Sequence, residues 1–254
     1  MSRIDDAAVN IVQSDWPAPD SIHACATTRV GGVSRPPYDT FNLGDHVGDR
    51  PEDVAENRRR LRRTLALPSD PYWLRQVHGV RVVRAGGQPP GVEADGAWSA
   101  TPDVVCAVLV ADCLPVLITD DRATVVAAAH AGWRGLASGV LEQTVAALPV
   151  APGRLLAWMG PAIGPDVFEV GDEVRARFLE SDRDTENAFV PSPAGRWLAD
   201  LYTLARRRLH RAGVRRIYGG GFCTLRDQRF YSYRRDGTTG RMAALIWRDR
   251  CREG

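Results

Sequence analysis

Lysine is absent from this chain of 254 residues, so all 33 basic residues are arginine. This absence excludes catalysis through a lysine Schiff base and phosphate binding by a Walker-type lysine. The arginines are balanced by 31 acidic residues, which leaves a net charge of +2. Such a small charge does not suit a protein built around a nucleic-acid backbone, and we expect no nucleic-acid partner.

Cysteine is scarce, and long apolar runs are missing. The five cysteines are scattered and odd in number, which argues against a disulfide framework in a chain long enough to build its own core; they are Cys25, Cys106, Cys113, Cys223 and Cys251. No apolar run approaches the roughly 20 residues that span a bilayer, and residues 1–21 show no basic region followed by an apolar core. We therefore expect a reducing, cytoplasmic location and no membrane partner.

Composition and punctuation predict one domain that covers residues 1–254. Hydrophobic residues make up 44% and charged residues 25%, as in ordinary globular domains. Glycine and proline are spread along the chain, with no linker and no repeat. Apolar runs predict strands at 22–27, 72–77, 80–84, 104–111, 115–119, 124–129, 154–159, 215–218 and 242–247. Periodicity predicts helices at 51–67, 134–148, 172–180 and 200–212, with Asp200 as the N-cap of the last.

The first predicted helix carries one arginine on its apolar face. Arg58 lies four residues after Val54 and three before Leu61, and it therefore falls on the stripe that these residues form. An inward guanidinium needs an anionic partner, which is either a buried carboxylate or a ligand. The neighbouring arginines fall elsewhere, and we expect them on a solvated face; they are Arg59, Arg60, Arg62 and Arg63.

The most informative segment is residues 104–135, VVCAVLVADCLPVLITDDRATVVAAAHAGWRG. Two apolar runs in it flank residues 120–123, which are turn-prone and of hairpin length. If Thr119 pairs with Thr124, the same ladder sets Cys113 opposite His130, with side chains roughly 5 Å apart at Cβ. That distance suits two ligands of one metal ion.

A third soft donor, His78, lies at a predicted turn in the sequence QVHG. His78, Cys113 and His130 would make a His2Cys set, which leaves tetrahedral zinc one open position for water or substrate. The chain has no CxxC or HExxH motif, and a buried cysteine beside two ordinary hydrogen-bonded histidines is the alternative. The remaining histidines have no such geometry and are expected to be structural or exposed; they are His23, His46 and His210.

Directly after His130, residues 131–135 lead from a predicted strand end into a predicted helix. Backbone amides at such a start favour an anion, and the glycines, including Gly132, allow close approach. Arg134 would add a charge-assisted contact. The alternative is that the glycines only permit a tight turn.

Motifs along nearly the whole chain resemble the YfiH family, whose members are often labelled laccase-domain or polyphenol oxidase proteins and include purine nucleoside-cleaving enzymes. The matching stretches, in order, are RVGGVS (29–34), YDTFNLG (38–44), LRQVHG (74–79), ADG (94–96), ADCLPVL (111–117), AAHAGWRG (128–135), GPAIG (160–164), FEVG (168–171) and FYSYRRDGTTGRMAALI (230–246).

The resemblance implies an α+β fold, a single domain of stacked mixed β-sheets flanked by helices in an α/β/β/α sandwich like that of cysteine hydrolases. It also implies a zinc or copper site on His78, Cys113 and His130, with Cys113 as a candidate nucleophile. Asn42 and Arg58 fall in motifs that recur around the family's pocket. The activities implied are phosphorolysis of adenosine, inosine and methylthioadenosine, and deamination of adenosine.

Three classes of enzyme remain after these observations. A multicopper oxidase needs many imidazoles, and the chain has only five histidines; a single copper is still conceivable. A zinc-dependent purine nucleoside enzyme needs an anion site for phosphate, for which the candidates are Arg58, Arg134 and the turn at Gly132. An amide hydrolase of cell-wall metabolism would use Cys113 as nucleophile and His130 as base. We expect the nucleoside enzyme, with a nucleoside and phosphate as its partners and its oligomeric state open.

Overall fold

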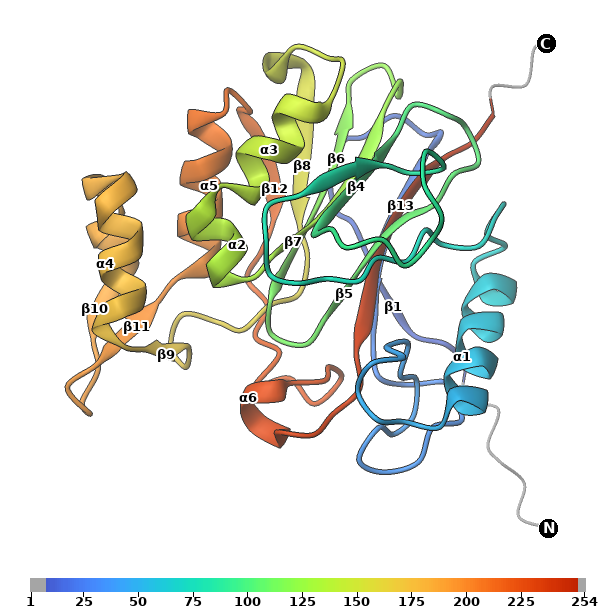
Figure 1. Ribbon diagram of the computed structural model, residues 1–254, viewed down its shortest axis with the longest axis horizontal. Helices are drawn as coiled ribbons and strands as arrows, with labels where there is room; N and C mark the ends of the chain where they lie inside the picture. The colour runs from blue at the N-terminus through green and yellow to red at the C-terminus, as the bar shows by residue number, and fades with distance from the viewer. Residues whose placement is uncertain (1–7, 251–254) are drawn as a thin grey trace.

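Two stacked β-sheets form the centre of the protein (Figure 1). The structure is a computed structural model and describes residues 8–250. The larger sheet has six strands in the order β12 (Arg216–Gly219), β8 (Leu155–Met159), β6 (Leu114–Asp120), β7 (Val126–Ala131), β4 (Gly96–Ser99) and β3 (Val82–Arg84). The other sheet has four antiparallel strands in the order β1 (Ile11–Gln13), β2 (Ile22–Thr27), β13 (Met242–Arg248) and β5 (Cys106–Val110).

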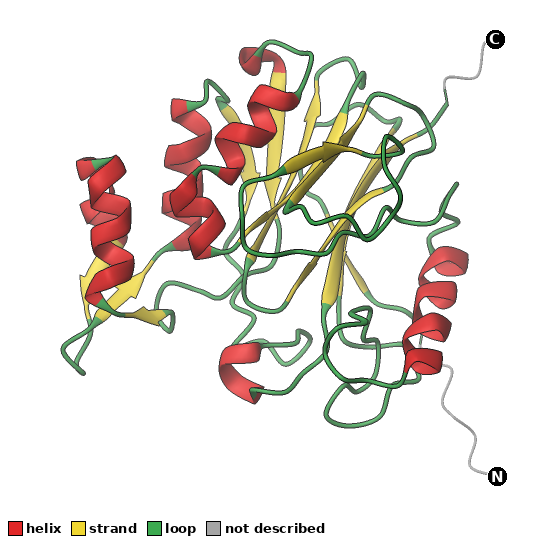
Figure 2. Cartoon of the chain, viewed as in Figure 1, coloured by secondary structure: helices red, strands yellow, loops and turns green. Residues whose placement is uncertain are grey.

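Helices cover the outer faces of both sheets (Figure 2). The outer face of the six-stranded sheet packs against α2 (Trp133–Ser138), α3 (Val140–Ala147) and α5 (Leu201–Arg211). The outer face of the four-stranded sheet packs against α1 (Pro51–Thr64) through Leu61. This arrangement confirms the predicted α/β/β/α sandwich.

A smaller unit lies at one side of the sandwich, where α4 (Asp172–Ser181) packs on a three-stranded sheet (Figure 1). That sheet has the order β10 (Phe189–Pro191), β11 (Trp197–Ala199) and β9 (Glu169–Val170). The remaining helices are α6 (Tyr233–Asp236) and two 3-10 turns, Pro152–Arg154 and Arg183–Ala188.

Alternation along the central strands explains why the two sheets and the helices form separate layers. In β6, Val116 and Ile118 pack toward the helices, whereas Leu117 packs toward the four-stranded sheet. In β7, Ala129 faces the helices and Ala128 faces the other sheet. Both faces of these strands are buried, so their sequences read as continuous apolar runs.

Most predicted strands and helices are present, and two predictions are wrong. The predicted helix at 134–148 is two helices, because Gly139 between them adopts a left-handed conformation with φ of 101°. The predicted strand at 72–77 forms only isolated bridges at Tyr72 and Arg75. The cap was predicted correctly, since the Asp200 side chain accepts hydrogen bonds from the Tyr202 and Thr203 amides.

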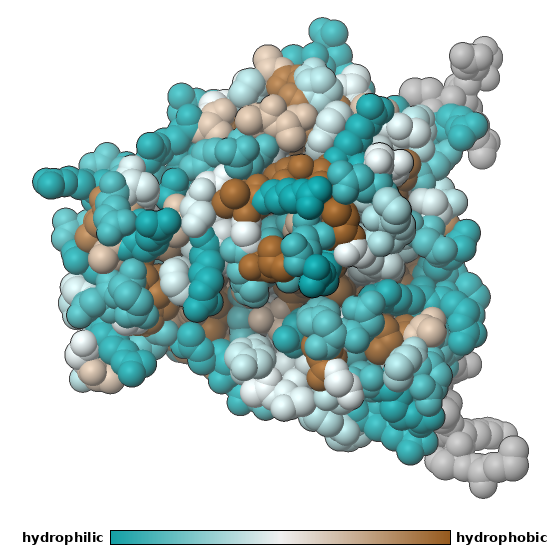
Figure 3. Space-filling model, in the orientation of Figure 1, coloured by the Kyte–Doolittle hydropathy of each residue, from teal (hydrophilic) through white to brown (hydrophobic). Residues whose placement is uncertain are grey.

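The surface is largely polar where it can be seen. Figure 3 shows that hydrophilic residues cover most of one face of the molecule, with smaller hydrophobic areas between them. Within residues 8–250, no helix is long and apolar enough to cross a membrane. The thiols of Cys25, Cys106, Cys113 and Cys223 are free, and Cys251 lies outside the described residues.

Candidate metal centre

The hairpin formed by β6 and β7 brings Cys113 and His130 to the same face of the sheet. Its register differs by two residues from the prediction, because Thr119 pairs with Val126 rather than with Thr124. The Asp120 carboxylate accepts hydrogen bonds from the amides of Thr124 (2.6 Å) and Val125 (3.1 Å), which holds both residues in the turn. A shift of two residues preserves the face of every side chain, so Cys113 lies diagonally across from His130 instead of directly opposite.

The position opposite Cys113 in this register belongs to Gly132, which continues β7 beyond Ala131. A Cβ atom at position 132 would lie 2.9 Å from the Cys113 Sγ and 3.0 Å from the His78 Nδ1. Both distances are shorter than ordinary van der Waals contact. Glycine therefore leaves free the space in which the cysteine and histidine side chains meet.

The buried carboxylate of Asp95 fixes the positions of both histidines. Asp95 immediately precedes β4, and its carbonyl accepts a hydrogen bond from the His130 amide (2.7 Å). Its carboxylate is 2.8 Å from the His130 Nδ1. It also accepts hydrogen bonds from the amides of Val77 (3.2 Å), His78 (2.9 Å) and Gly79 (2.7 Å). His78 has a φ of 58°, and successive amides in such a turn can converge on an anion.

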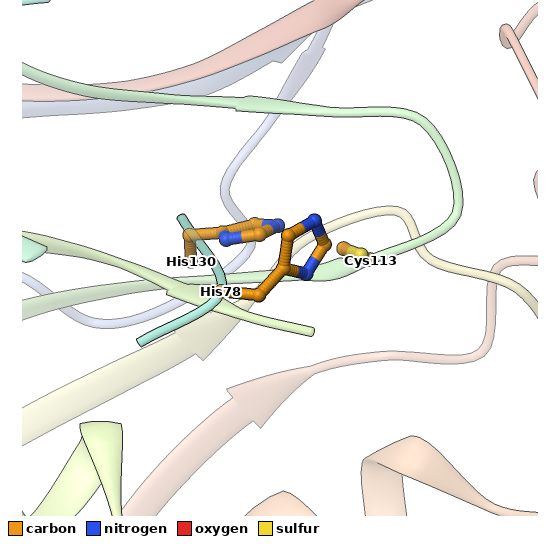
Figure 4. A group of neighbouring side chains, drawn as sticks. All are labelled: His78, Cys113 and His130. Carbon is orange, nitrogen blue, oxygen red and sulfur yellow. The ribbon is translucent and has the colours of Figure 1, made fainter. Parts of the chain in front are cut away.

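These constraints bring the donor atoms of His78, Cys113 and His130 within 4.8 Å of one another. The two imidazole rings lie 4.7 Å apart with 71° between their planes. Figure 4 shows both rings and the Cys113 sulfur converging from three separate segments. Because Asp95 contacts the Nδ1 of His130, the Nε2 of His130 is the nitrogen left for a metal. The donor set, its spacing and the space at Gly132 all fit a single metal ion with one open coordination position.

Electrostatics in the site favour the thiolate form of Cys113. Burial alone would raise the pKa of Cys113, but the charge of His130 and hydrogen bonds with His130 and His78 outweigh it and lower this pKa. Burial alone would lower the pKa of His130, but Cys113 and Asp95 raise it instead. A thiolate is the form in which cysteine binds a metal or attacks a substrate.

A cavity of about 540 Å³ opens above the donor atoms, and three arginines line it. The three arginines are Arg134, Arg234 and Arg241, and none of them forms an ion pair with another described residue. Of these, Arg134 and Arg234 are exposed, whereas Arg241 is half-buried. The wall also includes His46 and Tyr233. The cavity therefore offers positive charge beside the thiolate and the imidazoles.

Arg58 is held away from this wall. Its guanidinium donates to the Leu43 carbonyl (3.1 and 2.9 Å), forms an ion pair with Asp45 (3.2 Å) and stacks over the Trp73 ring. The partner of Arg58 is therefore a carboxylate of the protein, and Arg58 does not line the cavity; its predicted role in substrate binding stays a prediction. The expected exposure of Arg60 is corrected, because its side chain is only 17% exposed and donates to the Gly31 carbonyl.

Asn42 is fully buried, and both polar atoms of its side chain form hydrogen bonds within the protein. Its Oδ1 accepts hydrogen bonds from the amides of Gly44 (2.9 Å) and Arg241 (2.8 Å), and its Nδ2 donates to Asp49 (2.9 Å) and the Gly44 carbonyl (3.0 Å). Asn42 therefore does not line the cavity but holds the backbone of Arg241, and its predicted role in substrate binding stays a prediction. Sequence reasoning missed the roles of Asp95 and Arg241, although both fall within motif stretches shared with the YfiH family.

The remaining histidines occupy different surroundings. His23 is half-buried, stacks on Trp247 and lies 2.7 Å from the Asp249 carboxylate. His210 is exposed near the end of α5. His46 is exposed too, but it lines the cavity, which the spacing of the histidines in the sequence did not indicate.

Comparisons with known proteins agree with this fold over almost the entire chain. The family model described as "Multi-copper polyphenol oxidoreductase laccase" matches residues 23–249. The chain is 57% identical to purine nucleoside phosphorylase PA4543 of Pseudomonas aeruginosa, over 92% of this chain and 96% of that protein. It is 53% identical to purine nucleoside phosphorylase YfiH of Escherichia coli, over 93% and 98%. The crystal structure of Neisseria meningitidis protein NMB0706 is similar, with a TM-score of 0.91 and 49% identity over 95% of this chain and 100% of that one.

The first prediction concerns the space at Gly132. A Gly132→Ala variant should bind zinc at least about 10-fold more weakly than the unmodified protein, because its Cβ would intrude between Cys113 and His78. Gly132 has an ordinary φ of −61°, so alanine adds no backbone strain. The measurement is a zinc titration against a competing chelator.

The matched control is Gly153→Ala, because a Cβ at Gly153 would meet nothing within 4 Å. The control should bind zinc like the unmodified protein. Equal zinc affinity in the two variants would show that the metal is not held beside Gly132.

The second prediction concerns Asp95. An Asp95→Asn variant should lose roughly 10- to 100-fold in metal affinity, because the amide that replaces the carboxylate holds both histidines less firmly. Isothermal titration with zinc measures the effect, and circular dichroism verifies that the fold is kept. A folded variant with unchanged affinity would refute the positioning role of Asp95.

Proposed function

The chain belongs to the family described as multi-copper polyphenol oxidoreductase laccase, and from this premise we propose that it is a metal-dependent purine nucleoside phosphorylase. One observation carries the proposal: a His2Cys donor set lies at a cavity lined by three arginines that form no ion pair with the described residues. Such a cavity suits a substrate pair in which one member is an anion. The names of the Pseudomonas and Escherichia relatives, both purine nucleoside phosphorylases, support the same activity.

The two substrates of the reaction are a neutral nucleoside and a phosphate ion. A phosphate oxygen forms a bond to C1′ of the ribose while the C1′–N9 bond breaks. The electron pair of the broken bond passes to the purine, which takes up the proton that the hydrogen phosphate ion gives up. The products are the free base and ribose 1-phosphate. The arginines of the cavity would hold the phosphate and stabilise its charge through this step.

The residues that would hold the metal are His78, Cys113 and His130. A bound metal would supply Lewis-acid stabilisation of negative charge on a substrate oxygen. We propose zinc, because two imidazoles and one thiolate with an open position match its catalytic sites, and copper is the alternative for the same donors. Within residues 8–250 these three residues form the single group that could hold a metal, so the donor set does not fit a multicopper oxidase.

Further activities of the same site belong to this proposal. We include methylthioadenosine and inosine among the nucleosides that are cleaved, and deamination of adenosine as a second reaction. Arg134 is proposed to contact substrate from the cavity wall. We also propose that residues 1–254 form one catalytic domain and that the protein acts in the cytoplasm.

A cysteine-dependent amide hydrolase is the second candidate. The observation that favours it is the chain of contacts from Cys113 to His130 to Asp95, in which a base lies next to a nucleophile and is oriented by a buried carboxylate. This order matches the arrangement of nucleophile, base and orienting group in hydrolases. Metal binding and nucleophilic attack compete, because a thiolate bound to a metal attacks poorly.

The third prediction distinguishes these candidates. A Cys113→Ala variant should lose about 100-fold or more of its phosphate-dependent cleavage of adenosine and inosine, because it lacks one of three metal ligands. Chromatographic analysis of the products, with and without phosphate, measures the loss. Cys223→Ala is the control, since Cys223 is a half-buried free thiol that does not line the cavity, and it should retain activity.

A different outcome would favour the amide hydrolase. If the zinc-loaded protein leaves adenosine and inosine intact but cleaves an amide through a covalent adduct on Cys113, the phosphorylase proposal is wrong and the hydrolase is supported.

A further inference from the structure

The cavity arginines differ in burial and in what occupies their guanidinium groups. Arg134 is exposed and lies over the Trp133 ring. Arg234 is exposed and donates to the Glu169 carbonyl. Arg241 is half-buried, and its Nη1 donates to the carbonyls of Thr239 (2.9 Å) and Gly240 (3.0 Å). Arg241 is therefore the cavity arginine that is most shielded from water.

The Arg241 guanidinium also lies over the Tyr233 ring, 5.8 Å from its centre, and its remaining N–H groups are free to bind a ligand. Within the described part of the chain, no protein group accepts a hydrogen bond from its Nε or Nη2, and no carboxylate forms an ion pair with it. The two carbonyls that engage Nη1 fix the plane of the group. A planar guanidinium with two donors on one side matches two oxygens of a phosphate.

Two features of the surrounding loops hold the Arg241 side chain in place. The Arg241 amide donates to the Oδ1 of Asn42, which is fully buried. A Cβ at Gly44 would lie 2.8 Å from the Arg241 Cγ, so glycine there lets the stem of the arginine pack against the loop. Asn42 and Gly44 thus act as positioning residues for Arg241.

The electrostatic surroundings connect Arg241 with the metal ligands. Burial lowers the pKa of Arg241, while Cys113 and Asp112 act in the opposite direction. Each oxygen of the Asp112 carboxylate already accepts a hydrogen bond, one from the Thr224 hydroxyl and one from the Arg234 amide, and Asp112 forms no ion pair with Arg241 among the described residues. A half-buried cation that lacks a protein carboxylate gains more from an anionic ligand than an exposed one does, because charge interactions strengthen as water is excluded.

We propose that Arg241 binds the phosphate co-substrate. The phosphate would lie between the free edge of the Arg241 guanidinium and the donor atoms around Cys113. This inference rests on the proposed phosphorolysis and adds to it the location of the anion. It assigns the role to Arg241 rather than to Arg58, whose guanidinium is engaged by Leu43 and Asp45. Inorganic phosphate is the ligand class, and the nucleoside occupies the remainder of the cavity.

The test separates the Michaelis constants of the two substrates. In Arg241→Gln, the KM for phosphate should rise at least about 10-fold, while the KM for inosine stays within about twofold. Arg241→Lys keeps the charge but loses the two-pronged geometry. Its KM for phosphate should lie between those of the unmodified protein and Arg241→Gln. Arg177→Gln is the control, because Arg177 is 57% exposed and forms an ion pair with Glu180 on α4, away from the cavity lining.

Two kinetic results would overturn the inference while leaving the proposed function intact. One is an unchanged KM for phosphate in an active Arg241→Gln variant. The other is a rise confined to the KM for inosine, which would place Arg241 against the nucleoside.

A binding measurement decides the inference even if the protein cleaves no nucleoside. Inorganic phosphate should raise the Tm of the unmodified protein and of Arg177→Gln in a concentration-dependent manner, relative to chloride at equal ionic strength. The rise should be lost in Arg241→Gln, provided that its circular dichroism spectrum is native. An equal rise in all three proteins would refute Arg241 as the phosphate site.

Discussion

The buried carboxylate of Asp95 is the interaction on which the rest of the site depends. It accepts hydrogen bonds from three successive amides at residues 77–79 and contacts the His130 imidazole. A carboxylate without these partners would be costly to bury at this depth. Because the four donors come from a loop and from strand β7, the carboxylate ties the two segments together, and both histidines take their positions from it.

The remaining parts of the site follow from close approach and from charge. Gly132 leaves room where an ordinary side chain would separate Cys113 from His78. The thiolate and the metal that it would bind lie beside a cavity wall rich in arginine. Lysine is absent from the chain, and guanidinium groups provide the positive charge with fixed geometry. The site therefore consists of a small donor set with opposite charges held in fixed positions around it.

The resemblance implied the layers of the fold, and the hairpin pattern with the QVHG turn suggested the three donor residues, but neither indicated the contacts that connect distant loops. Continuous apolar runs identified β6 and β7, and the error in the hairpin register did no harm because it was an even number of residues. The resemblance implied the same three residues as metal ligands. The roles of Asn42 and Arg58 could not be read in this way, since they depend on contacts such as that between Asn42 and Arg241, 199 residues apart in the chain. Helix periodicity placed Arg58 on the inner face, yet the loop that carries Asp45 decided its partner.

The central claim is that His78, Cys113 and His130 hold one metal ion, and X-ray absorption at the zinc edge tests it most directly. The spectrum of the zinc-loaded protein should fit one sulfur at about 2.3 Å and two imidazole nitrogens at about 2.0 to 2.1 Å. The sulfur contribution should vanish in Cys113→Ser. A spectrum with only nitrogen and oxygen ligands, unchanged by that substitution, would contradict the account.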